Sequence, residues 1–332
     1  MKSLVRKGME VLYSNALTSK KFKQRNGEVV VLMYHGVVDV DPILPDWCIL
    51  RKEQFEKQIK FLTENFNVIP LLEAVEGIKN DVITGPTAVI TFDDGYQNNH
   101  DIAFPILEKY RAPASIFVST KFIDTEDTLW TGVLQNAFGK TTLTSMEWKG
   151  QNLDLSTTMN KKKSMEFIKS KLKEENYSVI EKNTNEIVDV LSEGEGFRID
   201  ASSPYRMLTS AQIEIMAKSE LIDFGAHTHN HPILSGLSRE DQKFEIEHSI
   251  ECVTQMTDSS CKSFAYPNGG EADFTDETMG LLEEAEMAVS LSTKLGLCRK
   301  GTPLMAYKRF GIGDETDFKR GLYKMYKMSS QF

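Results

Sequence analysis

Short hydrophobic segments alternate with longer amphipathic segments along most of the chain. The hydrophobic segments are rich in β-branched residues and have the length of strands; they lie at residues 29–34, 88–92, 114–118, 221–224, 263–266, 287–291 and 306–312. The amphipathic segments have the apolar spacing of helices and lie at residues 53–65, 98–110, 210–219, 239–256 and 276–286. This alternation predicts an α/β fold, with a mostly parallel sheet or barrel and helices outside it.

One region interrupts the alternation. Residues 121–205 contain few strand signals, and residues 160–192 have the Lys/Glu-rich pattern of charged helices. A segment of this length is too long for a simple loop, so we expect a mainly helical insertion subdomain at about 121–205. No repeat or flexible linker divides the remainder, which predicts one domain over residues 29–332 after an extension at residues 1–28.

Composition and charge exclude several classes of protein. The 332 residues are 40% hydrophobic and 26% charged, which excludes a disordered or fibrous chain. With 48 acidic and 39 basic residues the net charge is −9, which disfavours nucleic acid as a partner. The four cysteines lie far apart without a C-x-x-C pair, as in a protein with reduced thiols. No apolar run reaches the length of a transmembrane helix.

The first 28 residues differ from the rest in charge. They hold seven basic and two acidic residues, a net charge of +5. Charges at Arg6, Lys7 and Glu10 interrupt the apolar stretch that a signal peptide needs, so we expect a cytoplasmic protein. A basic amphipathic helix here could make peripheral contact with an anionic membrane. We favour a helix that packs on the body of the protein, because its apolar face is short and no lipidation motif is present.

Two clusters of reactive side chains directly follow expected strands. Asp93 and Asp94 lie in the segment TFDDGY, and His227, His229 and His231 lie in the segment HTHNHP. Adjacent carboxylates repel each other unless a positive charge lies beside them, and a divalent metal supplies that charge. Histidine nitrogens with a carboxylate oxygen are typical ligands of zinc and neighbouring transition metals.

The expected barrel brings these clusters to one face. Catalytic groups in barrels gather at the carboxyl ends of the strands, where both clusters lie. His35 ends the first strand in the run VVVLMYH, and the loop YPNGG at residues 266–270 follows a later strand. We therefore expect His35 and backbone N–H groups of that loop beside the two clusters.

These motifs resemble those of the polysaccharide deacetylases of carbohydrate esterase family 4, which share the nodulation-type chitooligosaccharide deacetylase homology domain. TFDDGY is similar to the first motif of the family, and H-T-x-x-H-P at residues 227–232 is similar to the second. The resemblance extends from about residue 28 to about residue 312, interrupted by the segment 121–205. It implies a distorted (β/α)7-type, TIM-like barrel with a mainly helical insertion.

The resemblance also implies a function. Family members use one divalent metal ion to remove an acetyl group from an N-acetylated sugar, so the expected partner is an N-acetylated carbohydrate. Matched motif by motif, Asp94, His227 and His231 would hold the metal, and Asp93 would be the catalytic base. Zinc is the expected ion, and cobalt, nickel or manganese would also accept these ligands. The metal would lower the pKa of a bound water toward ~7 while Asp93 takes the proton of that water.

The sequence departs from the family pattern at the general acid. The usual Leu-x-His motif on a late strand is missing, because no histidine follows residue 248. Some family members resemble circular permutants in which that strand comes first, and Leu32-Met33-Tyr34-His35 is similar to their motif. His35 is therefore our expected general acid; the alternative is a buried structural histidine that caps the strand.

A second departure concerns the third motif, usually Arg-x-Pro-Tyr-Gly. This chain has Ala-Tyr-Pro-Asn-Gly at residues 265–269, so the arginine that braces the catalytic aspartate is missing. Arg309 could reach Asp93 from a late strand, or it could be an ordinary surface residue. The oxyanion would be held by a backbone N–H near Asn268, a role that does not depend on the side chain.

The remaining candidates are substrate contacts. His229 shares the side of the two ligand histidines if the segment is extended, and we expect it to support them or to face the substrate. Tyr96, Trp47 and Trp130 could stack on sugar rings or simply be packed inside the protein, and Tyr96 is the best placed of them.

Three other functions remain open. An O-acetyl esterase needs the same chemistry. Another barrel metallohydrolase would use the H-x-H of His227 and His229, but its further histidine ligands from later strands are absent. A carbohydrate-binding protein without activity would be expected to have lost the base or a ligand, and Asp93 and Asp94 are both present. The sequence identifies neither the sugar nor the oligomeric state.

Overall fold

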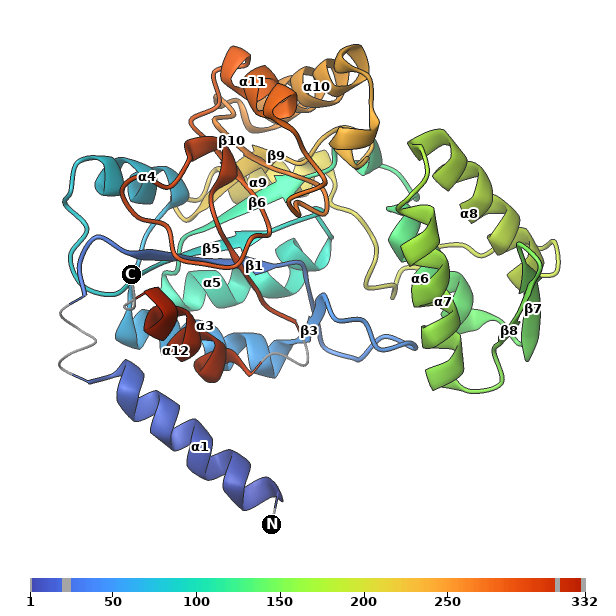
Figure 1. Cartoon of the computed structure of the whole chain (residues 1–332), viewed down its shortest axis with the longest axis horizontal. Helices are drawn as coiled ribbons and strands as arrows, with labels where there is room; N and C mark the ends of the chain where they lie inside the picture. The colour runs from blue at the N-terminus through green and yellow to red at the C-terminus, as the bar shows by residue number, and fades with distance from the viewer. Residues whose placement is uncertain (1, 20–24, 314–316, 330–332) are drawn as a thin grey trace.

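Seven parallel strands form a curved sheet at the centre of the protein (Figure 1), in a computed structural model that describes residues 2–19, 25–313 and 317–329. In spatial order the strands are β11 (Val289–Leu291), β10 (Ser263–Ala265), β9 (Ile222–Ala226), β6 (Ala114–Val118), β5 (Thr87–Phe92), β1 (Val29–Tyr34) and β12 (Phe310–Gly311). The short strand β4 (Asn67–Val68) also pairs with β5.

The central strands are buried on both faces. Strands β1 and β5 pair along their whole length, from Val29 opposite Thr87 to Tyr34 opposite Phe92, and every residue of both is buried. Parallel strands covered by helices on both faces have such continuous apolar sequences. The predicted α/β barrel fold is confirmed.

The last predicted strand differs from expectation. The segment expected at residues 306–312 follows the 3-10 helix η4 (Leu304–Ala306) and pairs as β12 over two residues only. Tyr307 is bonded to the opposite edge of the sheet: its N–H donates to Ser290, and its carbonyl accepts from the N–H of Ser292. This segment therefore links β11 to β1 and carries Arg309 into the interior.

Helices and short connections surround the sheet. They are α3 (Lys52–Asn65), α4 (Leu71–Lys79), η1 (Asn99–Ala103), α5 (Phe104–Tyr110), η2 (Thr120–Phe122), α9 (Ser210–Ala217), η3 (Leu234–Gly236), α10 (Arg239–Thr257) and α11 (Asp276–Glu284). Two short strands, β2 (Gly36–Val38) and β3 (Ile49–Arg51), form a separate pair between β1 and α3. The helices expected at 53–65, 210–219, 239–256 and 276–286 are all present within a few residues.

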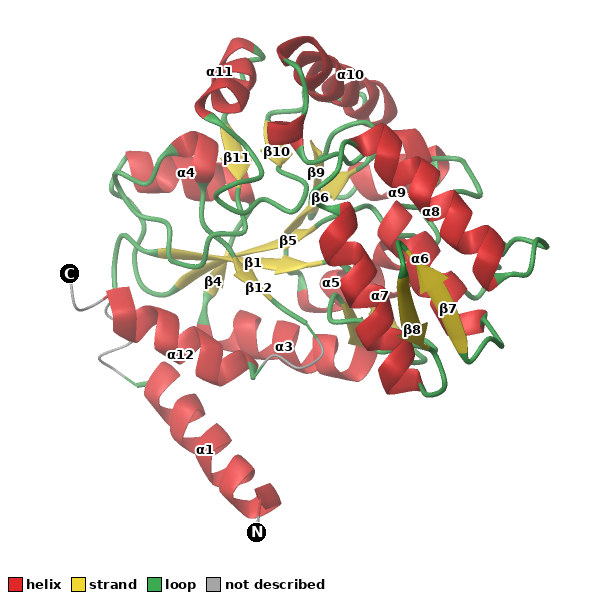
Figure 2. Ribbon diagram, turned by 45° about the vertical axis from the view of Figure 1, so that its right-hand side comes forward, coloured by secondary structure: helices red, strands yellow, loops and turns green. Residues whose placement is uncertain are grey.

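The segment between β6 and α9 packs around a separate hydrophobic cluster, to which Leu44 of the loop after β2 also contributes. Its elements are α6 (Trp130–Lys140), the antiparallel hairpin of β7 (Ser145–Trp148) and β8 (Gln151–Asp154), α7 (Thr158–Leu172) and α8 (Tyr177–Leu191). Figures 1 and 2 show this subdomain beside the sheet, beyond the carboxyl end of β1.

The terminal helices pack against each other. Tyr13 of α1 (Lys2–Leu17) contacts Tyr323 of α12 (Phe318–Ser329) at 5.4 Å between ring centroids, and Lys319 pairs with Glu10 at 3.7 Å. Leu17 is fully buried. The end of α1 thus packs on the body of the protein. Within the described ranges no helix combines the length and apolar character that crossing a bilayer requires.

Candidate active site

Two histidines and one carboxylate converge at the carboxyl ends of β5 and β9. Asp94 Oδ1 lies 3.5 Å from His227 Nε2 and 3.4 Å from His231 Nε2. One ligand atom of each residue lies within 4.8 Å of the other two, and all three residues are buried. Burial alone would raise the pKa of Asp94, but hydrogen bonds from the two histidines lower it well below its usual range.

The histidines are oriented as metal ligands require. His227 donates through Nδ1 to the carbonyl oxygen of Ala265 at 2.6 Å, so Nε2, on the side of Asp94, is the ring nitrogen that can bind a metal. Desolvation lowers the pKa of His231 and so favours the neutral imidazole that binds metal. Two nitrogens and one carboxylate oxygen fit zinc or a neighbouring divalent ion and leave positions open for water and substrate.

Left-handed backbone conformations position these ligands. Asp94 has a φ of 75° and Gly95 a φ of 84°. A Cβ atom on Gly95 would lie 2.9 Å from Val118, so this turn requires glycine. Thr228 and His231 have φ values of 64° and 60°. Such conformations are uncommon outside glycine and persist only when the surrounding structure holds them.

Glu245 of α10 holds the loop between the two histidine ligands. Its carboxylate accepts from the backbone N–H groups of His229 and Asn230, both at 2.8 Å, and from Asn230 Nδ2 at 2.6 Å. The residue is buried, and desolvation raises its pKa despite these hydrogen bonds. A buried acceptor on successive N–H groups stabilises the turn that brings His227 and His231 together.

The second carboxylate of the motif is paired with a buried arginine. Asp93 Oδ1 accepts from Arg309 Nη1 at 2.7 Å, and Arg309 is 0% exposed. Arg309 Nε also donates to the carbonyl of Ser292 at 2.9 Å. Burial by itself would raise the pKa of Asp93, but the charge of Arg309 lowers it below its usual value. The alternative that Arg309 is a surface residue is therefore wrong.

His35 lies at the end of β1 and lines the same cavity as Asp93 and Asp94. Its ring contacts that of Trp47 edge-on, with 5.2 Å between centroids. Among the described residues its Nδ1 atom has no hydrogen-bond partner, although it is buried. Asn99 donates to the His35 carbonyl at 2.7 Å and fixes the backbone. The imidazole is thus held by packing and remains available for proton transfer.

A cavity of about 420 Å³ is lined by the three proposed metal ligands together with Asp93 and His35. The barrel contributes the proposed metal ligands, Asp93 and His35, together with Asp46, Trp47, Tyr96 and Asn268. The insertion subdomain contributes its other wall, from α6 and from α7 with the residues that follow it: Thr131, Gly132, Glu166, Lys169, Ser170 and Lys173. A cavity of this size accommodates a small ligand or part of a longer chain.

The three aromatic candidates for sugar stacking differ in their exposure and in their location. Trp47 is 53% exposed and lines the cavity, which suits a stacking contact. Tyr96 also lines it, but is 2% exposed and packs edge-on against Tyr205. Trp130 lies in the separate core of the insertion. Trp47 is therefore more accessible than Tyr96, which the sequence favoured.

The His229 side chain lies outside the cavity, contrary to the expectation that it supports the ligands or faces the substrate. Its Nδ1 lies 2.9 Å from Thr120 Oγ1, and its ring contacts that of His248 at 4.6 Å between centroids. The expectation assumed an extended segment, in which alternate residues share one side. The left-handed residues Thr228 and His231 break that alternation.

Asn268 lines the cavity in the loop after β10, with a φ of 58°. Gly269 follows with a φ of 68°, and its carbonyl accepts from the N–H of Thr293 at 2.8 Å. Thr293 Oγ1 donates to the Asn268 carbonyl at 2.9 Å. The N–H of Gly269 donates to the carbonyl of Pro267 at 2.7 Å, so of these two residues Asn268 is the one whose N–H can face an oxyanion.

Several cavity residues have no signal in the sequence. Asp46 lies in the loop between β2 and β3, and Lys169 and Lys173 lie in the insertion. Glu245 was missed because it lies in an ordinary charged helix. These residues reach the site through tertiary structure, which local motifs do not encode.

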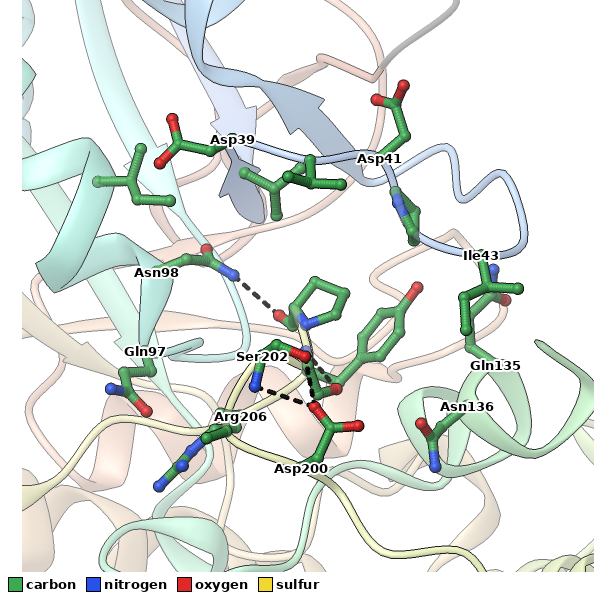
Figure 3. A pocket seen from close by; sticks show the side chains of 18 of the residues that line it. Asp39, Asp41, Ile43, Gln97, Asn98, Gln135, Asn136, Asp200, Ser202 and Arg206 are labelled. Atoms are coloured by element: carbon green, nitrogen blue, oxygen red, sulfur yellow. Dashed lines mark hydrogen bonds between the residues drawn. The ribbon is translucent and has the colours of Figure 1, made fainter. Parts of the chain in front are cut away.

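A second cavity, of about 470 Å³, lies between the β2–β3 loop, η1 and the insertion. Figure 3 shows Asp39 and Asp41 on one side and Asp200, Ser202 and Arg206 on the other. Of the residues that line the catalytic cavity, Tyr205 also lines this one. It contains none of the proposed catalytic or metal-binding residues.

Comparisons with known proteins give a matching family model and two similar curated proteins. The sequence model of the family described as polysaccharide deacetylase matches residues 83–290. The Bacillus subtilis protein YxkH, whose name assigns it to that family, is 31% identical over 102 residues, 30% of this chain and 35% of that protein. The poly-beta-1,6-N-acetyl-D-glucosamine N-deacetylase of Staphylococcus epidermidis is 30% identical over 118 residues, 32% of this chain and 40% of that protein. Each match thus spans less than half of the relative.

Solved structures show the same fold at lower identity. The deacetylase PplD of Streptococcus pyogenes superposes with a TM-score of 0.59 at 17% identity, covering 91% of this chain and 99% of that one. IcaB of Ammonifex degensii also gives a TM-score of 0.59 at 17% identity, with 91% and 97% covered. Both superpositions cover most of the chain.

Proposed function

Because the chain belongs to the polysaccharide deacetylase family, we propose that it is a metal-dependent hydrolase that removes the acetyl group of an N-acetylated sugar. The substrate is a polysaccharide, an oligosaccharide or a glycan precursor. The observation that carries the proposal is the convergence of Asp94, His227 and His231 beside the Asp93–Arg309 pair in one cavity.

Asp94, His227 and His231 would hold the metal. A divalent metal held there would make water nucleophilic at neutral pH and would polarise the acetyl carbonyl. Asp93 accepts the proton of the attacking water, and the charge of Arg309 keeps its carboxylate ionised beforehand. Hydrolysis therefore begins with a proton transfer whose acceptor is fixed by a buried ion pair.

The departing amine needs a proton. His35, in the same cavity, donates it as the general acid of the permuted family variant. The backbone N–H of Asn268 stabilises the oxygen that becomes negative during attack. Trp47 offers its exposed ring to the sugar.

Acetate release tests the proposed function. The metal-loaded protein should release acetate from N-acetylglucosamine oligosaccharides, sugar nucleotides or simple N-acetylated sugars. We expect Asp93→Asn to lower kcat by about 10²–10⁴-fold, because the asparagine amide cannot accept the proton, while metal content stays at the wild-type value. Absence of acetate from every substrate in the panel, with metal bound, would contradict the proposed activity.

His35→Ala is expected to lower kcat on N-acetyl substrates by about 10²–10⁴-fold with metal content unchanged. A substrate whose leaving group needs no proton, such as 4-nitrophenyl acetate, should be much less affected. His100→Ala, which alters a surface histidine paired with Asp101, is the matched control and should retain activity. Equal losses on both substrate types would show that His35 is only structural.

A further inference from the structure

The insertion subdomain presents two lysines to the catalytic cavity. Lys169 lies in the last turn of α7, and Lys173 follows one turn later at the end of the helix. Residues four apart lie on the same face of a helix, so both ammonium groups can point to one place. They approach from the wall opposite the barrel, which holds Asp94 and the histidines.

The charges of these lysines are only partly compensated. Lys169 has a side chain that is 12% exposed; its Nζ donates to Gln135 Oε1 at 3.3 Å and lies 3.6 Å from a carboxylate oxygen of Glu166. That carboxylate is 52% exposed. Among the described residues, no carboxylate lies within ion-pair distance of Lys173. Desolvation and the charge of Lys169 lower the pKa of Lys173, although Asp273 and Glu166 oppose this.

Such a pair is unfavourable without a ligand. Like charges four residues apart destabilise a helix. The side chain of Lys169, at 12% exposed, has also lost much of its hydration, whereas Lys173 is exposed at the mouth of the cavity. The protein as a whole carries a net charge of −9, so local cations are needed to attract an anion into this cavity. Ammonium groups are compact charges that bind phosphate and carboxylate well.

We propose that Lys169 and Lys173 bind an anionic group, phosphate or carboxylate, that the substrate carries next to its acetylated sugar. This inference rests on the proposed function and narrows its substrate class to anionic glycans or phosphorylated sugar precursors. The acetyl group lies at Asp94 and the anion lies against the end of α7. The insertion thereby determines which sugars bind productively.

Charge neutralisation within the cavity is the competing explanation. Asp46 also lines the cavity, so the lysines could balance the carboxylates of the barrel. No ion pair joins either lysine to Asp46 or Asp94 among the described residues. Neutralisation would affect neutral and anionic sugars alike, whereas an anion subsite affects anionic ligands only.

Calorimetric binding to the full-length, metal-loaded protein separates these explanations. The ligands are methyl N-acetylglucosaminide, N-acetylglucosamine 6-phosphate, N-acetylglucosamine 1-phosphate and N-acetylmuramic acid, which differ in the presence and position of the anion. We expect an anionic sugar to bind about ten- to hundredfold more tightly than the neutral one, from one or two charged hydrogen bonds. Whether the phosphorylated sugars or N-acetylmuramic acid show the larger gain in affinity tells whether the subsite prefers phosphate or carboxylate.

The double variant Lys169→Gln/Lys173→Gln should remove that preference while binding of the neutral sugar changes less than about threefold. Lys171→Gln is the matched control, because Lys171 lies on the same helix, pairs with Glu174 and does not line the cavity. Anionic sugars that bind the double variant as tightly as the wild type, or an equal loss for all ligands, would overturn the inference.

Acetate release measured on the same sugars keeps the two proposals distinguishable. Acetate formed without any preference for anionic sugars contradicts the anion subsite and supports the deacetylase. Lysine-dependent anion binding without acetate from any substrate supports the subsite and contradicts the deacetylase. A preference in both binding and kcat/KM that disappears in the double variant supports both.

Discussion

Arg309→Met is expected to lower the free energy of unfolding by about 3–5 kcal/mol, because it leaves the Asp93 carboxylate buried without its partner. Asp93 is 3% exposed and Arg309 is 0% exposed, so solvent compensates little for the lost 2.7 Å hydrogen bond. The pKa of Asp93 loses its main lowering influence, and the base is protonated more readily. Chemical denaturation with a metal-loaded sample measures the stability, and acetate release measures the activity.

The double variant Asp93→Asn/Arg309→Met tests whether loss of the ion pair causes the lower stability of Arg309→Met. A neutral amide beside methionine removes the buried charge, so the double variant should be more stable than Arg309→Met alone. It also keeps the test decisive if the single variant does not fold. Arg239→Met is the control: Arg239 pairs with Glu284 on the surface, and its loss should change the free energy of unfolding little. Additive losses in the double variant would contradict the coupling.

The fold was predictable because the strands are buried on both faces. Runs such as those of β1 and β5 are continuously apolar, and the segments between them have helical spacing. The last strand was less predictable. Phe310–Gly311 pairs with β1 for two residues only, while Tyr307 is hydrogen-bonded to the other edge of the sheet. Which residues of this segment bond to which edge depends on how the sheet curves. The hairpin of β7 and β8 was also missed, since its strands are short and mostly polar.

The site residues that could be predicted are those that follow strands of the parallel sheet. Asp94 and His227 directly follow strands, so the shared edge of a parallel sheet brings them together. His229 was mispredicted because left-handed residues on either side of it reverse the chain. Lys169, Lys173 and Glu245 could not be identified, because their approach to the site depends on packing between subdomain, helix and loop. Sequence motifs therefore identify site residues that follow strands, whereas residues brought to the site by packing are found only from the structure.

Removing any one of the three proposed metal ligands is expected to abolish acetate release and to reduce bound metal from about one ion per chain toward zero. Asp94→Ala, His227→Ala and His231→Ala each leave only two donors in a site whose donor atoms all lie within 4.8 Å of one another. Elemental analysis of protein purified without chelator measures the metal. His229→Ala is the matched control, because that histidine belongs to the same segment but its ring contacts His248 outside the cavity.

Thermal unfolding gives a readout that does not depend on catalysis. A metal that binds only the folded protein stabilises it by about 2.7 kcal/mol when its free concentration is a hundred times the Kd. A chelator should therefore lower the Tm of the wild type and of His229→Ala, and should leave the Tm of His231→Ala nearly unchanged. The three-ligand site would be contradicted by a His231→Ala protein that retains one ion per chain and a wild-type response to chelator. A metal lost from His229→Ala as well would place the site nearer α10, where the ring of His229 contacts that of His248.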